Sequence, residues 1–168
     1  VTIVKHPENH YFDFKIAGEE KAKILQISDL HIGCGFLTTQ TDRLVVKEVF
    51  TAVEKVDPHL IVVTGDALSP LYVRSGTRNS HNQLNAFIAL MEKIGRPWAF
   101  VFGNHDGEGT LSEEQISNRL EQVENCLYFG GDRNLTGNGN YYVKIYNDQT
   151  LSSALILLDS GGGNFLGY

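Results

Sequence analysis

The feature that most constrains the fold of this sequence is a regular alternation of apolar runs with segments of helical spacing. Lys23–Ser28, Leu60–Thr64 and Trp98–Phe102 read as three buried strands. Between them, apolar residues recur every three or four positions over 42–56 and again over 84–94, which is typical of amphipathic helices. Strands that alternate with helices in this way form a parallel sheet with right-handed crossovers. The sequence therefore predicts an α/β fold with a β-α-β-α-β centre.

The segments on either side of this centre have a different pattern. His10–Ile16 alternates apolar and polar residues, which predicts a half-buried edge strand. Ser112 and Gln115 have the spacing of a capping box and predict a third helix that runs to about residue 124. Asn140–Tyr146 and Leu151–Leu158 are strand-like runs joined by a turn-rich tetrapeptide, which is typical of a hairpin. Because a hairpin is antiparallel, we expect the sheet to become mixed toward the C-terminus.

Length and composition indicate one globular domain and exclude several classes of partner. The chain has 168 residues, of which 42% are hydrophobic and 20% charged, and no repeat or linker divides it, so we expect residues 1–168 to form a single domain. Fourteen basic against twenty acidic residues, with no Lys/Arg block, argue against binding to nucleic acid. No membrane span is indicated. Cys34 and Cys126 lack metal-finger spacing and are interpreted as free thiols, which favours the cytoplasm over secretion.

Polar residues follow each of the three apolar runs, at the point where each strand is predicted to end. Asp29 and His31 follow the first run, Asp66 the second and Asn104 the third, at nearly even spacing. In parallel α/β sheets ligands bind at the carboxyl ends of the strands, so these side chains are expected to meet at one edge. Each block alone also fits a polar turn. Together their oxygen and imidazole donors predict a site for Mn, Fe or Zn.

The third block also supplies two candidate catalytic residues. We interpret His105 as the donor of a proton to a leaving oxygen, or of a hydrogen bond to a phosphoryl group, with Asp106 orienting its ring. Asn104 and His105 would together contact the substrate phosphate. Asp66 follows a flexible glycine, and its two oxygens could bridge two ions. The expected reaction is attack on phosphorus by a metal-bound water, with two ions about 3.5–4 Å apart.

In their order, the blocks Asp-x-His, Gly-Asp and Gly-Asn-His-Asp resemble the calcineurin-like metallophosphoesterase superfamily. The segments LILLDSGG (155–162) and TGNGNYYV (136–143) resemble more narrowly the branch related to purple acid phosphatases. The resemblance implies two mixed sheets packed face to face with helices outside, as part of a four-layer α-β-β-α sandwich. It also implies that Asp29, His31, Asp66 and Asn104 are metal ligands, that Asp66 bridges two ions, and that His105 lies near the leaving oxygen.

The sequence departs from the family pattern at its C-terminal end. The family completes both metal sites with a later His and a Gly-His-x-His block, and neither follows Leu158 here. We therefore expect the chain to be the C-terminally incomplete front part of a longer phosphoesterase. The intact parent would hold two transition-metal ions (Mn, Fe or Zn), whereas these residues would hold one ion or none and have little activity alone.

The leading functional hypothesis is a phosphomonoesterase that acts on phosphorylated small molecules or phosphoproteins. One alternative is a non-catalytic scaffold that keeps the fold for partner binding. Another is that a second chain supplies the missing ligands by docking on the exposed sheet edge. The oxygen and nitrogen ligands found here serve several metals, so the sequence does not name the ion.

Overall fold

A computed structural model of the chain describes residues 1–18, 21–132 and 134–161. Gly162, the last residue of the LILLDSGG segment, lies outside the described residues. The elements, in chain order, are β1 (Thr2–His6), the short 3-10 helix η1 (Pro7–Asn9), β2 (Tyr11–Ile16), β3 (Ile24–Ile27), α1 (Thr39–Val56), β4 (Leu60–Thr64), α2 (Tyr72–Ser75), α3 (Ser80–Ile94), β5 (Trp98–Val101), α4 (Glu113–Leu120), β6 (Cys126–Leu127), β7 (Tyr141–Asn147) and β8 (Thr150–Leu157).

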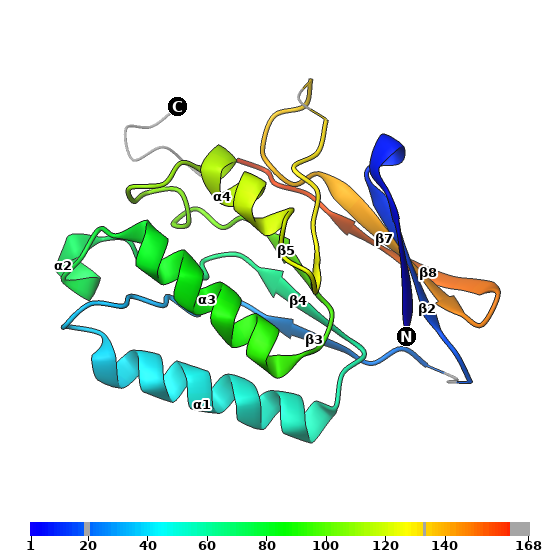
Figure 1. Cartoon of the computed structure of the whole chain (residues 1–168), viewed down its shortest axis with the longest axis horizontal. Helices are drawn as coiled ribbons and strands as arrows, with labels where there is room; N and C mark the ends of the chain where they lie inside the picture. Colours follow the sequence, from blue (N-terminus) through cyan, green and yellow to red (C-terminus); the bar gives the residue numbers. More distant parts are fainter. Residues whose placement is uncertain (19–20, 133, 162–168) are drawn as a thin grey trace.

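The strands form two four-stranded sheets (Figure 1). In the parallel sheet, of order β3-β4-β5-β6, every neighbouring pair is parallel. In the mixed sheet, of order β1-β2-β7-β8, the central pair is parallel and the two outer pairs are antiparallel. The predicted α/β fold with a β-α-β-α-β centre is confirmed. The predicted hairpin forms, but it joins the N-terminal strands in the second sheet and leaves the first sheet parallel.

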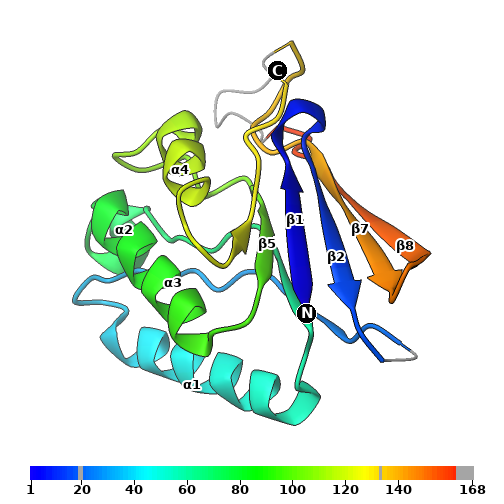
Figure 2. The ribbon, with the colours of Figure 1, turned by 45° about the vertical axis from the view of Figure 1, so that its right-hand side comes forward.

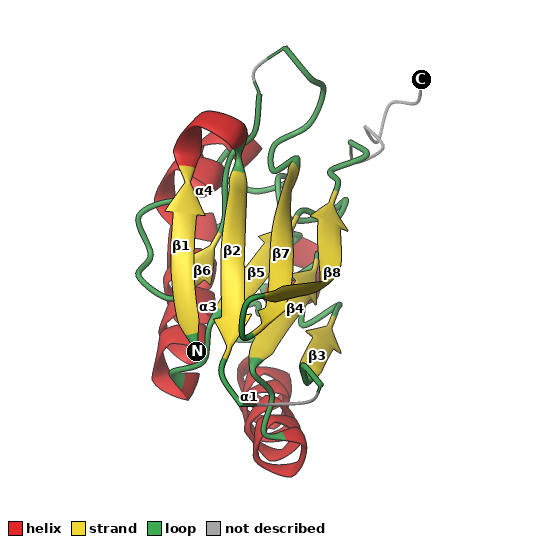
Figure 3. Cartoon of the chain, turned by 90° about the vertical axis from the view of Figure 1, so that its right-hand side faces the viewer, coloured by secondary structure: helices red, strands yellow, loops and turns green. Residues whose placement is uncertain are grey.

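The two sheets and the helices lie in three layers. Helices α1, α3 and α4 cover one face of the parallel sheet, and the mixed sheet lies on the other side of that sheet (Figure 2). Figure 3 shows the mixed sheet face-on, with the parallel sheet and the helices behind it. These are three layers of the α-β-β-α sandwich that the resemblance implied. No helix of the described residues covers the outer face of the mixed sheet.

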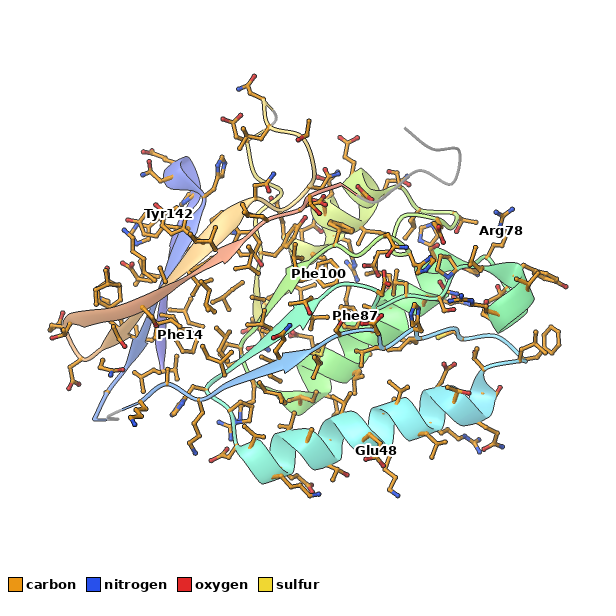
Figure 4. All side chains as sticks on the ribbon, turned by 180° about the vertical axis from the view of Figure 1, so that it is seen from behind. Phe14, Glu48, Arg78, Phe87, Phe100 and Tyr142 are labelled. Atoms are coloured by element: carbon orange, nitrogen blue, oxygen red, sulfur yellow. The ribbon has the colours of Figure 1, made fainter. Side chains whose placement is uncertain are left out.

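The core fills the spaces between these layers. Strand β4 contributes an apolar run whose first four residues are buried, and the inner face of β2 contributes alternate residues, among them Phe14. Figure 4 shows Phe87 of α3 and Phe100 of β5 in the middle of the molecule; their ring centroids lie 5.9 Å apart. The hydroxyl of Tyr141 donates to the Phe100 carbonyl over 2.8 Å and accepts from its amide over 3.0 Å. This residue therefore ties the mixed sheet to the parallel one.

Two strand predictions were wrong about position within a sheet. Strand β2 is not an edge strand, because β1 pairs with one side of it and β7 with the other. Strand β3 is itself the edge of the parallel sheet and is partly exposed, with Ile24 37% exposed. Apolar periodicity reports which face of a strand is covered, whereas edge position depends on partners that are distant in sequence. The capping box of α4 forms as predicted, but the helix ends at Leu120.

Candidate metal centre

The segments that follow strands β3 and β4 run side by side, which brings the first two polar blocks together. The amide of Asp29 donates to the Gly65 carbonyl over 3.1 Å, and the amide of His31 donates to the Asp66 carbonyl over 2.9 Å. The amide of Ile32 donates to the next carbonyl along, that of Ala67. The parallel ladder thus extends beyond the ends of the two strands and fixes the register between the first and second blocks.

Asp29, His31 and Asp66 form one cluster at this edge of the sheet. Each offers a ligand atom, and these atoms all lie within 4.8 Å of one another. Metal–nitrogen and metal–oxygen bonds of about 2.0–2.2 Å place two ligands of one ion up to about 4.4 Å apart, so the spacing is close to what a single ion needs. The Asp29 side chain is 65% exposed and that of His31 31%, so the cluster is open to solvent on one side.

The same residues share an uncommon backbone conformation. Asp29, His31 and Asp66 have φ values of 57°, 47° and 52°, in the left-handed region. Few residues other than glycine adopt this region, although Asp and His do so more readily than most. Such conformations persist where the surrounding structure imposes them, and they gather at functional sites. The backbone at this edge is therefore shaped to present these three side chains.

His31 carries a buried polar atom that the protein leaves unsatisfied. Its Nδ1 is buried and has no hydrogen-bond partner among the described residues, while its Nε2 lies 3.7 Å from Oδ1 of Asp29. An unpaired buried nitrogen is costly. Nε2 is the ring nitrogen that lies against Asp29, and two carboxylates with one imidazole form a donor set that fits a divalent metal ion.

Asp106 lies beneath the cluster, where it holds the backbone. Its side chain is fully buried and accepts from the amides of Asp66 (2.9 Å), Leu68 (3.0 Å) and Gly103 (2.9 Å). The structure does not show the predicted contact between Asp106 and the His105 ring: Nδ1 of that ring lies 2.7 Å from Glu108, and Asp106 accepts from backbone amides. Asp106 instead joins the second block to the third.

Burial raises the pKa of Asp106 from 3.8 to about 6, against the effect of the amide donors, and the nearby charge of Asp66 contributes to the rise. In metal-free protein the folded chain therefore takes up a proton at Asp106 at a higher pH than the unfolded chain does. Stability relative to the non-titrating variant Asp106→Asn should rise as pH falls through 6, by about 1.4 kcal/mol at pH 5 and by up to ~3 kcal/mol below about pH 3. Urea unfolding of both proteins at pH 7 and 5 measures this difference. A difference independent of pH would contradict the prediction.

The partner of His105 is Glu108. Nδ1 of His105 lies 2.7 Å from Oε2 of Glu108, and the amide of Glu108 donates to the His105 carbonyl, which closes a turn. The His105 ring lies beside that of His31, with centroids 5.6 Å apart. Glu108 was not among the residues predicted from the sequence. The available signal was an acidic residue between two glycines, three positions after the histidine.

Asn104 is the most exposed member of the third block. Its side chain forms no hydrogen bond with the described residues. The next amide, that of His105, donates to Oδ1 of Asp66 over 2.9 Å, which places the start of this block against the cluster. Its role as a metal ligand and phosphate contact stays a prediction.

Two glycines allow the second and third blocks to approach each other. Gly65 has a φ of 87°, and a Cβ added to it would lie 2.5 Å from the Cα of Gly103. A Cβ on Gly103 would collide with the carboxylate and the amide of Asp66. The Gly-Asp and Gly-Asn pairs are thus required by the close contact of two loops, in addition to the backbone freedom expected at Gly65.

The structure also tests the predictions about the cysteines and about membrane-spanning helices. Cys34 is exposed and Cys126 is buried, and both are free thiols, as predicted. Within the described ranges no helix has the length and apolar character needed to cross a membrane.

Comparison with known proteins gives the family. The sequence model of the family described as calcineurin-like phosphoesterase matches residues 22–166, which include all three blocks. The probable inactive purple acid phosphatases 28 and 29 of Arabidopsis thaliana are 32% and 28% identical over 74% and 92% of this chain. Phosphatase DCR2 of Saccharomyces cerevisiae is 30% identical over 84% of it. The chain spans 36%, 44% and 27% of the lengths of these three proteins, respectively.

The family match and the relatives agree with the fold and with the resemblance seen in the sequence, including its narrower link to purple acid phosphatases. The chain belongs to the calcineurin-like phosphoesterase family.

Proposed function

We propose that this chain is the metal-binding front part of a metal-dependent phosphoester hydrolase that cleaves phosphomonoesters of small molecules or phosphoproteins. The observation that carries the proposal is the cluster of Asp29, His31 and Asp66 at the ends of neighbouring parallel strands. Ligands bind at this edge of α/β sheets. Family membership supports phosphoester hydrolysis as the chemistry of the site.

The proposed ligands have separate tasks. Asp29, His31 and Asp66 would hold one ion, Asn104 would add a neutral oxygen, and Asp66 would bridge to a second ion in the complete protein. When bound, a transition-metal ion such as Mn, Fe or Zn polarises phosphoryl oxygens and makes a coordinated water more acidic. The neutral Asn104 keeps the negative charge of the site low, which favours the approach of a phosphate.

His105 would act on the substrate side of the cluster. Glu108 accepts most readily from a proton on Nδ1, so the remaining ring nitrogen is the one available to a phosphoryl or leaving-group oxygen. The carboxylate also holds the ring in one orientation, as an acidic partner does for many general acids and bases. Asp106 would support the site only through the backbone.

The test is hydrolysis of an aryl phosphate in the presence of Mn²⁺, with wild-type protein and Asp66→Asn. The 168-residue chain and, where the gene encodes more, the full-length product are both assayed. Loss of the central carboxylate should reduce metal-dependent activity at least 100-fold, since metal ligands and catalysis both depend on it. Asp132→Asn, at an exposed aspartate in the loop before β7, is the matched control and should keep full activity. Equal metal-dependent rates in full-length wild-type and full-length Asp66→Asn protein would overturn the assignment.

A second candidate function is a non-catalytic scaffold of the same fold. Two relatives are named probable inactive purple acid phosphatases, which favours this reading. Metal analysis of protein purified without chelators separates the two: a stoichiometric transition metal supports the hydrolase, and its absence supports the scaffold.

Docking of a partner along the outer strands β3 and β8 is a further proposal, supported by their position at the edges of the two sheets.

A further inference from the structure

We infer that the first turn of α3 is the positioning element of the metal centre, because Ser80 and Gln83 hold the loops of all three polar blocks. This inference rests on the proposed metal-binding function. Neither residue belongs to the ligand cluster, and both are fully buried. They are three positions apart on one helix and therefore share a face.

Gln83 joins the first loop to the second. Its Nε2 donates to the carbonyl of Gly33 over 2.8 Å and to the carbonyl of Ser69 over 2.9 Å. Gly33 follows His31 by two residues, and Ser69 follows Asp66 by three. Both partners are acceptors, so the nitrogen of the amide must face them. Its Oε1 is buried and unpartnered among the described residues, so the residue serves here only as a double donor.

Ser80 joins the same helix to the third loop. Its Oγ accepts from the amide of Thr110 over 3.0 Å, and its own amide donates to Oγ1 of Thr110 over 3.1 Å. Thr110 lies two residues after Glu108, the partner of His105. A Cβ on Gly109 would collide with Ser80 Oγ, so the loop and the helix are in direct contact. The loop that carries His105 and the loops that carry the candidate ligands are therefore all held by the same helix, α3.

The helix that makes these contacts is itself well anchored. The side chain of Asn79 caps it by accepting from the amide of Asn82 over 3.2 Å, and Phe87, Leu90 and Met91 are buried in the core. Groups behind the ligands fix the ligand geometry, and their loss typically weakens metal binding 10- to 100-fold. The strained backbone of the ligands makes such support necessary here, since a looser loop would relax toward commoner φ values.

The test compares two variants of α3 by Mn²⁺ titration calorimetry. Gln83→Met keeps the volume of the side chain but removes both donors, and it should weaken Mn²⁺ binding at least tenfold. Leu90→Ala, farther along the same helix, creates a core cavity and lowers stability without touching the loops, and its Mn²⁺ affinity should stay at the wild-type value. Affinities are measured at a temperature at which all three proteins are folded. Equal losses of affinity in the two variants would overturn the inference.

Amide hydrogen exchange gives a readout that needs no metal. In Gln83→Met, the amides of His31 and Ile32, which bond to the second loop, should exchange faster than global unfolding allows. In Leu90→Ala they should exchange no faster than the loss of global stability requires. Unchanged local exchange in Gln83→Met would contradict the inference. Failure of the wild-type protein to bind Mn²⁺ would instead overturn the proposed function, and the exchange data would still decide the role of Gln83.

Discussion

Alanine in place of Asp106 should remove about 3–6 kcal/mol of stability at pH 7, because it leaves three backbone amides, two of them part-buried, without their acceptor. Typical domains have only about 5–15 kcal/mol in total, so the variant would lose a large share of its stability. The contact between the second and third blocks should loosen most, since Asp106 is the side chain that joins them. Urea unfolding followed by circular dichroism measures the effect.

The matched control is Asp132→Ala. Asp132 also accepts from a backbone amide, that of Asn134, over 2.9 Å, but in an exposed loop where water can replace it. Its removal should cost about 0.5–1 kcal/mol or less. If both alanine variants lost equally little stability, the three-amide contact of Asp106 would not be what holds the two loops. A catalytic role for Asp106 would predict the opposite pattern, namely full stability with lost activity.

Gly65→Ala should destabilise the protein by about 2–5 kcal/mol and weaken metal binding as well. The new methyl group would meet the backbone of Gly103, which cannot move aside as a flexible side chain could, and overpacking of this kind costs about 1–3 kcal/mol. The left-handed backbone at φ 87° adds about 1–2 kcal/mol for any residue with a Cβ. Since Asp66 follows directly, separation of the two loops would also displace its carboxylate.

The variant Gly95→Ala separates the cost of the left-handed backbone from the cost of steric contact with the neighbouring loop. Gly95 ends α3 with a φ of 69°, but a Cβ there would meet nothing within 4 Å. This variant should lose only the conformational part, about 1–2 kcal/mol, and should bind Mn²⁺ as wild-type does. Thermal unfolding with and without Mn²⁺ compares the two variants. A loss as large in Gly95→Ala as in Gly65→Ala would mean that backbone strain, and not contact between the loops, explains the glycine of the Gly-Asp pair.

The sequence was sufficient to place the ligand cluster, for a physical reason. Ile24–Ile27 and Leu60–Thr64 are apolar runs that pair as parallel strands, and parallel strands must carry the residues after their C-terminal ends to one edge. Block order and strand context therefore located Asp29, His31 and Asp66 without any knowledge of tertiary contacts. Their action as ligands stays a prediction.

The supporting groups could not be found in the same way. Asp106 was predicted to be the partner of His105 because it is the next residue, but neighbouring side chains tend to point in different directions. The turn closed by Glu108 brings that residue back to the ring instead. Gln83 sits in a helix whose pattern reports only a buried position, and its two acceptors lie in loops far away in sequence. Strand β1 was missed because its exposed, mixed composition carries no period-2 signal.

The pairing of β2 with β7 has a consequence for the order in which the protein folds. The parallel sheet and its three polar loops are built from a continuous stretch, residues 24–127, in which each strand meets a partner one crossover away. Tyr11, by contrast, pairs with Tyr142, near the other end of the described chain. Contacts between such distant segments form late. During synthesis we therefore expect the cluster to assemble before the mixed sheet does. The apolar face of β1 and β2 would stay uncovered until β7 has left the ribosome.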